Sequence, residues 1–219
     1  MEPPFPQCKN TGMMPFSNKQ TTLLSSVYLA PVEYYASLYR SEFVVIEIND
    51  NYQKQSYRNR CTIAGANGPL SLSIPIVKPD KDNSKMKDIR IADHANWRHL
   101  HWNAIISAYN STPYFQYFED DFRPFYERKV EFLHDFNEEL RQLICNIIEI
   151  ESKVCYTQTY IREGNTDYID LREKIHPKKE SDFKTESYYQ VFDSKHGFIN
   201  NLSILDLLFN MGKEARLIF

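Results

Sequence analysis

Two short apolar runs near the start of the chain predict strands that are buried on both faces. The first run spans residues 23–30 and the second spans residues 43–48. Pro31 lies between them and is placed to begin a helix, because apolar residues follow it at helical intervals. A strand, a helix and a strand in this order predict the βαβ unit of a parallel sheet. Ligands bind such sheets off the carboxyl ends of the strands, so we expect a crevice near residues 29–31 and 49–51.

A β-hairpin is predicted after this unit. Residues 60–64 and 70–76 are β-prone runs that flank residues 65–68, a segment that contains the turn-forming pair Asn-Gly. The two glycines of this segment form a turn and not a phosphate loop, because no Lys-Ser or Lys-Thr pair follows them. Side chains alternate between the two faces of a strand, and we expect Cys61 and Ile63 to face the core together.

Further along the chain, the spacing of apolar residues changes from period two to helical. Helices are predicted at residues 95–110 and 120–150, and short strands at residues 88–91 and 154–161. The longer helix is continuous or is divided near Pro124. Ser203 and Gly212 are placed to begin and to end a short helix. Residues 164–186 are charged and lack apolar periodicity, which predicts a surface loop of the kind that often forms a lid.

These elements predict an α/β fold. Its central sheet is mostly parallel and is built on the N-terminal βαβ unit, with the β-hairpin as an insertion and helices packed on the sheet. Residues 1–22 carry four prolines and no sustained apolar period, so we expect a poorly ordered leader. Residues 23–219 are long enough to bury the core of a single domain.

Composition narrows the classes of function. The net charge is −3 and basic runs are short, which gives no support to a nucleic-acid surface. The four cysteines show neither CxxC spacing nor a zinc signature, so we predict a reduced compartment, no metal site and no cofactor. No apolar run reaches the roughly 20 residues of a membrane span. We also find no signal peptide, and we predict a cytoplasmic protein.

Polar chemistry is concentrated in residues 52–60. Lys54 and Arg60 are cationic donors suited to a phosphate or a carboxylate. Asn59 offers both a donor and an acceptor that can orient a ligand, and Tyr52 offers a ring that can stack on a sugar or a base. The alternatives are that the cations are solvated or paired with nearby acidic residues, and that Asn59 caps a strand.

His101 is the predicted general acid or base, because an unperturbed histidine has a pKa of about 6.5. On the predicted helix it points to the core side, near the same stripe as Trp97. We predict substrate contacts for Trp97, Tyr34 and Tyr109, and catalytic roles for His101 and Lys54. The alternatives are a hydrogen-bonded core histidine and aromatic rings that fill the core.

The order of these features resembles the WbqC-like protein family over roughly residues 23–212. The resemblance rests on Pro31, Tyr52-x-Lys54, Asn59-Arg60, the helix with His101 and Ala108-Tyr109, Pro113-Tyr114-Phe115, and the late NLSILDLLF. It implies a bacterial origin among genes for O-antigen or other cell-surface polysaccharide, and transfer of an amino acid, glycine in particular, onto a sugar. The family's usual Gln-Pro before the aromatic turn is replaced here by Val27–Pro31, so no role for that Gln carries over.

Three classes of function follow. The first is a transferase that moves an acyl or aminoacyl group onto an amino sugar or nucleotide sugar. In that reaction Lys54 and Arg60 hold the activated donor, and His101 deprotonates the amine. The second is a non-catalytic protein that binds sugar nucleotides or acts as a scaffold in the same pathway. The third is a nucleotidyl-type enzyme, which Ala30-Pro31 disfavours because this turn lacks glycine.

Overall fold

A four-stranded parallel sheet forms the base of the molecule. The computed structural model describes residues 21–79 and 83–219. The strands of this sheet are β1 (Thr21–Ser25), β2 (Phe43–Glu47), β5 (Lys153–Tyr156) and β6 (Tyr168–Asp170), in the order β5-β2-β1-β6. All three pairings are parallel. The predicted α/β class with a parallel central sheet is confirmed.

The N-terminal βαβ unit is confirmed in particular. Helix α1 (Val32–Arg40) connects β1 to β2, and the two strands pair with Leu23 opposite Val45. The central residues of β1 and β2 are buried, as both faces of a covered parallel strand require. Strand β1 ends at Ser25 and is shorter than the predicted run of residues 23–30, and the chain has a positive φ of +40° further on, at Leu29.

The predicted hairpin is also present. Strands β3 (Arg60–Gly65) and β4 (Gly68–Ser73) pair antiparallel, with Cys61 and Ile63 fully buried as expected. Gly68 has φ +108°, and a Cβ on Gly65 would come within 2.9 Å of the Gly68 carbonyl oxygen. Glycine is therefore required at both ends of this tight turn.

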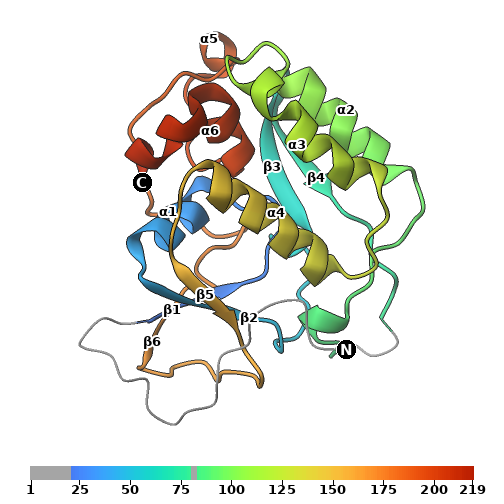
Figure 1. Cartoon of the computed structure of the whole chain (residues 1–219), viewed down its shortest axis with the longest axis vertical. Coiled ribbons are helices and arrows are strands. Elements are labelled where there is room, and N and C mark those ends of the chain that lie inside the picture. The colour runs from blue at the N-terminus through green and yellow to red at the C-terminus, as the bar shows by residue number, and fades with distance from the viewer. Residues whose placement is uncertain (1–20, 80–82) are drawn as a thin grey trace.

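Helices cover the hairpin and the sheet (Figure 1). They are α2 (Trp97–Tyr109), α3 (Phe115–Glu127), α4 (Leu133–Ile147), α5 (Asp193–His196) and α6 (Ile204–Met211), with the 3₁₀ helices η1 (Met86–Asp88) and η2 (Gly212–Ile218). Helix α2 packs on β3 and on α3, while α6 contacts α1, α3 and β3. Ser203 caps α6 through its side chain and Gly212 ends it, as predicted. In the described residues, no helix combines the length and apolar character needed to span a membrane.

The prediction for residues 120–150 placed the division at the wrong point. Pro124 lies inside α3, and the chain leaves the helix at residues 128–132. The cause is tertiary: Ile91 donates its N–H to the Glu131 carbonyl, and Leu133 donates its own to the Ile89 carbonyl. This pairing with residues 89–91 takes the backbone of residues 131–133 out of a continuous helix.

Three other predictions are corrected. Residues 88–91 form the end of η1 and isolated β-bridges instead of a strand. Strand β5 ends at Tyr156 and does not reach residue 161. The predicted loop at residues 164–186 contains the edge strand β6, which is too short to show alternation. The predicted leader, residues 1–22, lies outside the described residues except for Thr21 and Thr22, which belong to β1.

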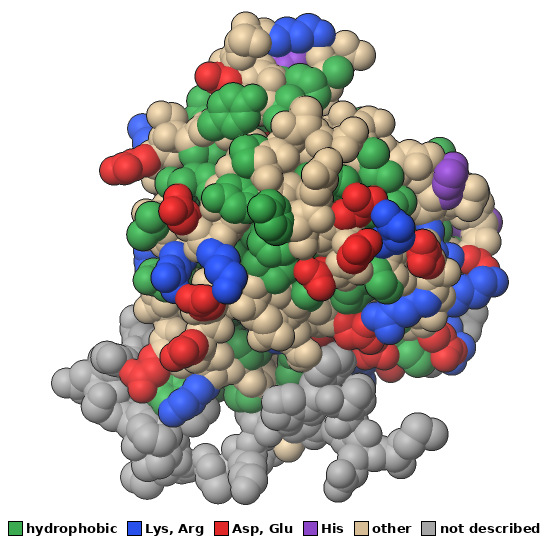
Figure 2. Space-filling model, turned by 45° about the horizontal axis from the view of Figure 1, so that its top comes forward, with side chains coloured by type: hydrophobic (Ala, Val, Ile, Leu, Met, Phe, Trp, Pro, Cys, Tyr) green, Lys and Arg blue, Asp and Glu red, His purple; other side chains and the backbone are tan. Residues whose placement is uncertain are grey.

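Positive and negative side chains are mixed on the face of the molecule that Figure 2 shows. Lysine and arginine side chains lie among aspartates and glutamates on the described part of this face. Ion pairs at the surface include Arg128 with Glu139 and Arg216 with Glu149. Interspersed charges of both signs give no strong electrostatic field of one sign on this face.

Candidate functional site

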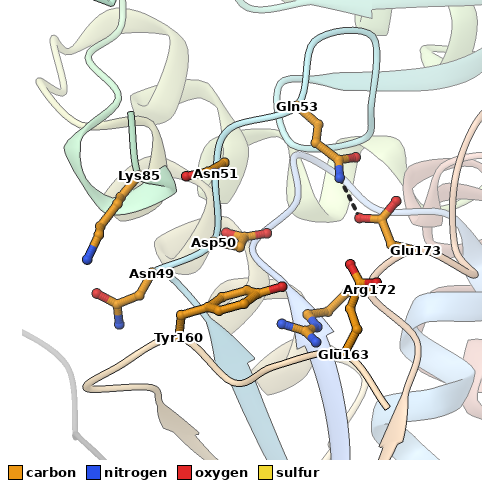
Figure 3. Close-up of a pocket in the computed structure, with 9 residues that line it drawn as sticks. All are labelled: Asn49, Asp50, Asn51, Gln53, Lys85, Tyr160, Glu163, Arg172 and Glu173. Atoms are coloured by element: carbon orange, nitrogen blue, oxygen red, sulfur yellow. Dashed lines mark hydrogen bonds between the residues drawn. The ribbon is translucent and has the colours of Figure 1, made fainter. Parts of the chain in front are cut away.

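A cavity of about 410 Å³ lies at the carboxyl end of β2 (Figure 3). Its lining combines three amides, three carboxylates, two cations and one aromatic ring, from Asn49, Asp50, Asn51, Gln53, Lys85, Tyr160, Glu163, Arg172 and Glu173. The chain reaches this position because β2 delivers residues 49–51 directly beyond its last residue. This is the part of the crevice that the βαβ pattern predicted at residues 49–51.

Asp50 is the most constrained carboxylate of the lining. It is 7% exposed, and its Oδ2 atom accepts a hydrogen bond from Nη2 of the buried Arg58. Its Oδ1 atom is buried and has no hydrogen-bond partner among the described residues. Burial raises the pKa of the Asp50 carboxyl above its ordinary value, although Arg58 opposes this change. Asp50 is therefore a stronger base than a surface aspartate.

Arg58 joins Asp50 to the opposite wall. Its Nη1 atom donates to Gln53 Oε1 at 3.2 Å, and its Nη2 atom lies 3.6 Å from Glu173 Oε1. Gln53 in turn donates to Glu173 at 2.6 Å, the bond drawn in Figure 3. These contacts connect the segment after β2 to residue 173, and they hold the side chains in one arrangement.

A second buried ion pair supports the cavity from below. Glu47 is fully buried at the end of β2 and accepts hydrogen bonds from Asn49 N, Thr157 Oγ1 and Ile161 N. Arg172 Nη1 lies 3.4 Å from Glu47 Oε2 and 2.8 Å from the Ile161 carbonyl oxygen. The far edge of Arg172 donates to both carboxylate oxygens of Asp170, at 2.9 and 2.6 Å. Arg172 thereby fixes residues 161–172 against β2.

Tyr160 supplies the aromatic surface of the cavity. Its ring is 45% exposed and lies across the opening between Asn49 and Arg172 (Figure 3). The guanidinium carbon of Arg172 lies 5.4 Å from the ring centre, so the ring is held by a cation–π contact. An exposed ring next to amides and carboxylates is suited to stack on a sugar while the polar groups bind its hydroxyls.

Three predicted site residues lie on α2 in the core beneath the hairpin. His101 is 5% exposed, bonds to the Tyr28 hydroxyl through Nδ1 at 3.0 Å, and meets the Trp97 ring edge-on. Burial lowers the pKa of His101 to about 4, with a backbone contact to Ser73 acting in the opposite direction. The Tyr109 hydroxyl accepts a hydrogen bond from Ala64 N. In the described structure, these three residues do not line the cavity.

The other predicted residues are spread over several elements. Lys54 is exposed in the turn after Gln53. Asn59 donates to the Ile74 carbonyl, and Arg60 donates to Ser73 Oγ at 2.9 Å on the hairpin. Tyr52 is half-buried, and Tyr34 is buried with its hydroxyl on the Ser25 carbonyl. Arg60 and His101 thus both contact Ser73, while the cavity is lined by other residues of the described chain.

Sequence reasoning missed the four lining residues that come from residues 160–173. The only signal was the charged, aperiodic character of residues 164–186, which predicted a loop of the lid type. Nothing in the sequence singled out Arg172, because its partner Glu47 lies 125 positions away. Among the described residues, we find no group of three or more His, Cys, Asp or Glu side chains arranged to hold a metal ion.

A comparison with protein families decides the affiliation of the chain. A sequence model of the WbqC-like protein family matches residues 26–181, which is more than half of the chain. The chain belongs to the WbqC-like protein family. The matched region includes the cavity residues from Asn49 to Glu173, so the site lies within the part that this WbqC-like chain shares with its family.

A curated relative covers nearly the whole WbqC-like chain. It is the "Uncharacterized protein Rv1507c" of Mycobacterium tuberculosis, which is 24% identical over 225 aligned positions. The alignment spans 90% of this chain and 96% of the relative. No solved structure matches the chain. The function must therefore be argued from the cavity.

Proposed function

We propose that this protein transfers an acyl or aminoacyl group, such as a glycyl group, onto an amino sugar or nucleotide sugar. The acceptor is bound in the cavity at the end of β2. The observation that carries the proposal is the lining, in which amides, carboxylates and the Tyr160 ring share one hollow. Amides and carboxylates bind sugar hydroxyls, and an aromatic ring stacks on the apolar face of a sugar. A volume of about 410 Å³ falls in the range of small-molecule sites.

The proposed setting is the one that the resemblance to the family implies. We assign the reaction to the biosynthesis of a bacterial surface polysaccharide of the O-antigen type, in the cytoplasm, where activated sugars and acyl donors are formed. The two substrates are a sugar or nucleotide sugar and an activated acyl donor.

Asp50 is the proposed base. It takes a proton from the nucleophilic nitrogen or oxygen of the acceptor, and that atom bonds to the carbonyl carbon of the donor. The bond from this carbon to the leaving group breaks, its electron pair goes to the leaving group, and the leaving group takes up the proton. The raised pKa of Asp50 suits it to this role, because a carboxylate with a raised pKa binds the proton more strongly.

The catalytic roles of Lys54 and His101 stay predictions. A buried histidine whose pKa is lowered to about 4 is neutral at pH 7, so it is able to accept a proton if a substrate reaches it. The same burial favours a structural role under the hairpin.

The test is a transfer assay with a glycyl thioester as donor and glucose, glucosamine and their uridine diphosphate conjugates as acceptors. Acylated product is measured by mass spectrometry. Asp50→Asn is expected to lower the initial rate by about 100-fold or more, the usual range for loss of a general base. His101→Gln is expected to retain most of the rate.

Glu151→Gln is the matched control. Glu151 is an exposed carboxylate that precedes β5, so it lies at the amino end of the parallel strands, whereas the cavity lies at their carboxyl end. It should leave the rate unchanged. A rate lost in His101→Gln but retained in Asp50→Asn would assign the base to His101 and overturn our assignment.

The second candidate function is sugar binding without turnover. The observation that favours it is the ion pair between Asp50 and Arg58. A carboxylate that is already paired with an arginine is able to hold a ligand without taking a proton from it. Binding of a sugar to the cavity without product from any donor would establish this alternative. Absence of both binding and product would contradict both functions.

A further inference from the structure

We infer that the buried wall of the cavity binds the amino group of an amino sugar, and that it excludes a diphosphate. This inference rests on the proposed function and chooses between its two acceptors. The wall consists of Asn49 and Asp50, which are 4% and 7% exposed and follow β2 directly. An amine seated here would bring its nitrogen to the carboxylate that we propose as the base.

Two acceptor atoms of this wall lack donors. Asp50 Oδ1 and Asn49 Oδ1 are both buried, and neither has a hydrogen-bond partner among the described residues. The other atoms of the two side chains are occupied: Asp50 Oδ2 accepts from Arg58, and Asn49 Nδ2 donates to the Thr157 carbonyl at 2.9 Å. Buried polar atoms nearly always have partners, so a ligand that fits this wall must bring donors. An ammonium group carries three donors and no acceptor.

The arginines beside the cavity have few donors left for an anion. Arg172 uses Nε, Nη1 and Nη2 on Asp170, Glu47 and the Ile161 carbonyl. Arg58 uses Nη1 and Nη2 on Gln53 and Asp50. Its buried Nε has no partner among the described residues, but Arg58 is not part of the cavity lining. A phosphate is normally recognised by the free fork of an arginine, by a helix start or by a lysine. Here the arginine forks are already bound to protein carboxylates.

The charges point in the same direction. The lining has three carboxylates, from Asp50, Glu163 and Glu173, against the two cations Lys85 and Arg172. Arg172 is also shared with two further carboxylates, Glu47 and Asp170. A cation is attracted to such a wall, and a diphosphate is repelled by it.

Lys85 is the exception, and its place is informative. It is an exposed residue of the lining. In Figure 3 it lies on the other side of Tyr160 from Arg172. A phosphate carried by the acceptor or by the acyl donor would therefore meet Lys85 at the edge, while the amino group occupies the wall.

Calorimetric titration of the whole protein at pH 7 tests the inference with three probes: glucosamine, N-acetylglucosamine and uridine diphosphate. We expect glucosamine to bind at least about tenfold more tightly than N-acetylglucosamine, because acetylation removes the charge and two donors. We expect uridine diphosphate to bind more weakly than glucosamine. Equal binding of the two sugars, or tighter binding of the diphosphate, would overturn the inference.

Two variants and a control locate the preference. Asp50→Asn should abolish the preference for glucosamine. Glu163→Gln, at an exposed position that does not endanger the fold, should reduce it two- to threefold. Glu151→Gln should leave it unchanged. A preference that survives both cavity variants would contradict the assignment to this wall, and the Glu163→Gln result stands even if Asp50→Asn fails to fold.

The two proposals fail in different ways. If glucose or its uridine diphosphate conjugate is acylated at a hydroxyl while glucosamine shows no binding preference, the transferase function holds and the amine site is wrong. If glucosamine binds with the expected preference but no donor gives product, the amine site holds and the transferase function is wrong.

Discussion

Arg172→Met should destabilise the protein by about 3 kcal/mol, because it leaves Glu47 charged and buried. Removal of one partner of a buried ion pair typically costs about 3–5 kcal/mol. The lower end applies here for two reasons. Glu47 keeps three other hydrogen bonds, from Asn49, Thr157 and Ile161, and its contact with Arg172 is a long one at 3.4 Å. Asp170, the other partner of Arg172, is partly exposed and is solvated when the arginine is lost.

The assay is equilibrium unfolding in urea, followed by the fluorescence of the two tryptophans. Arg162→Met is the matched control, since Arg162 is exposed ten positions earlier on the same segment. Glu47→Gln and the double variant complete a double-mutant cycle, in which the double variant should be less destabilised than the sum of the single variants. If Arg172→Met and Arg162→Met agree within about 0.5 kcal/mol, the variation expected for surface changes, the reasoning is refuted.

Three further predictions concern other parts of the chain. Burial raises the pKa of Asp206 to about 6 from an ordinary 3.8, so the folded state binds this proton more tightly than the unfolded state. Stability should therefore fall by up to about 3 kcal/mol as the pH rises from about 4 to about 6. In urea titrations at several pH values, Asp206→Asn should remove this part of the pH dependence. An unchanged pH profile would show that Asp206 does not cause it. Gly212→Ala should lower the thermal unfolding midpoint more than Gly164→Ala. Both glycines have positive φ, but only at Gly212 would the new Cβ come within 2.6 Å of the Tyr114 ring. An equal decrease of the midpoint in the two variants would contradict the clash. His101 should titrate near pH 4 in a nuclear magnetic resonance experiment, and a midpoint near 6.5 would mean that its burial is wrong.

Local pattern predicted the fold where short-range rules decide the structure. The βαβ unit, the hairpin with buried Cys61 and Ile63, and the capped helix after Ser203 all follow from neighbouring residues. The errors arose where distant backbone groups pair. Residues 131–133 leave the helix because they bond to residues 89 and 91, and β6 exists because it adds to β1 at the edge of the sheet.

The site was predicted only in its position. The end of β2 was expected to carry a crevice, and Asn49 and Asp50 line the cavity there. The residues chosen for chemistry were selected by type, as cations, a histidine and aromatic rings, and none of them lines this cavity in the described chain. Type alone does not report that Arg172 is held by Glu47 and Asp170, or that Asp50 Oδ1 lacks a donor.

The most direct test of the account is a crystal structure of the protein with glucosamine bound. We predict the sugar in the cavity at the end of β2, with its nitrogen at hydrogen-bond distance, about 2.7–3.2 Å, from Asp50 Oδ1 and its ring against Tyr160. Glucosamine bound instead between Arg60 and His101 at the hairpin, with the β2 cavity empty, would contradict the central claim.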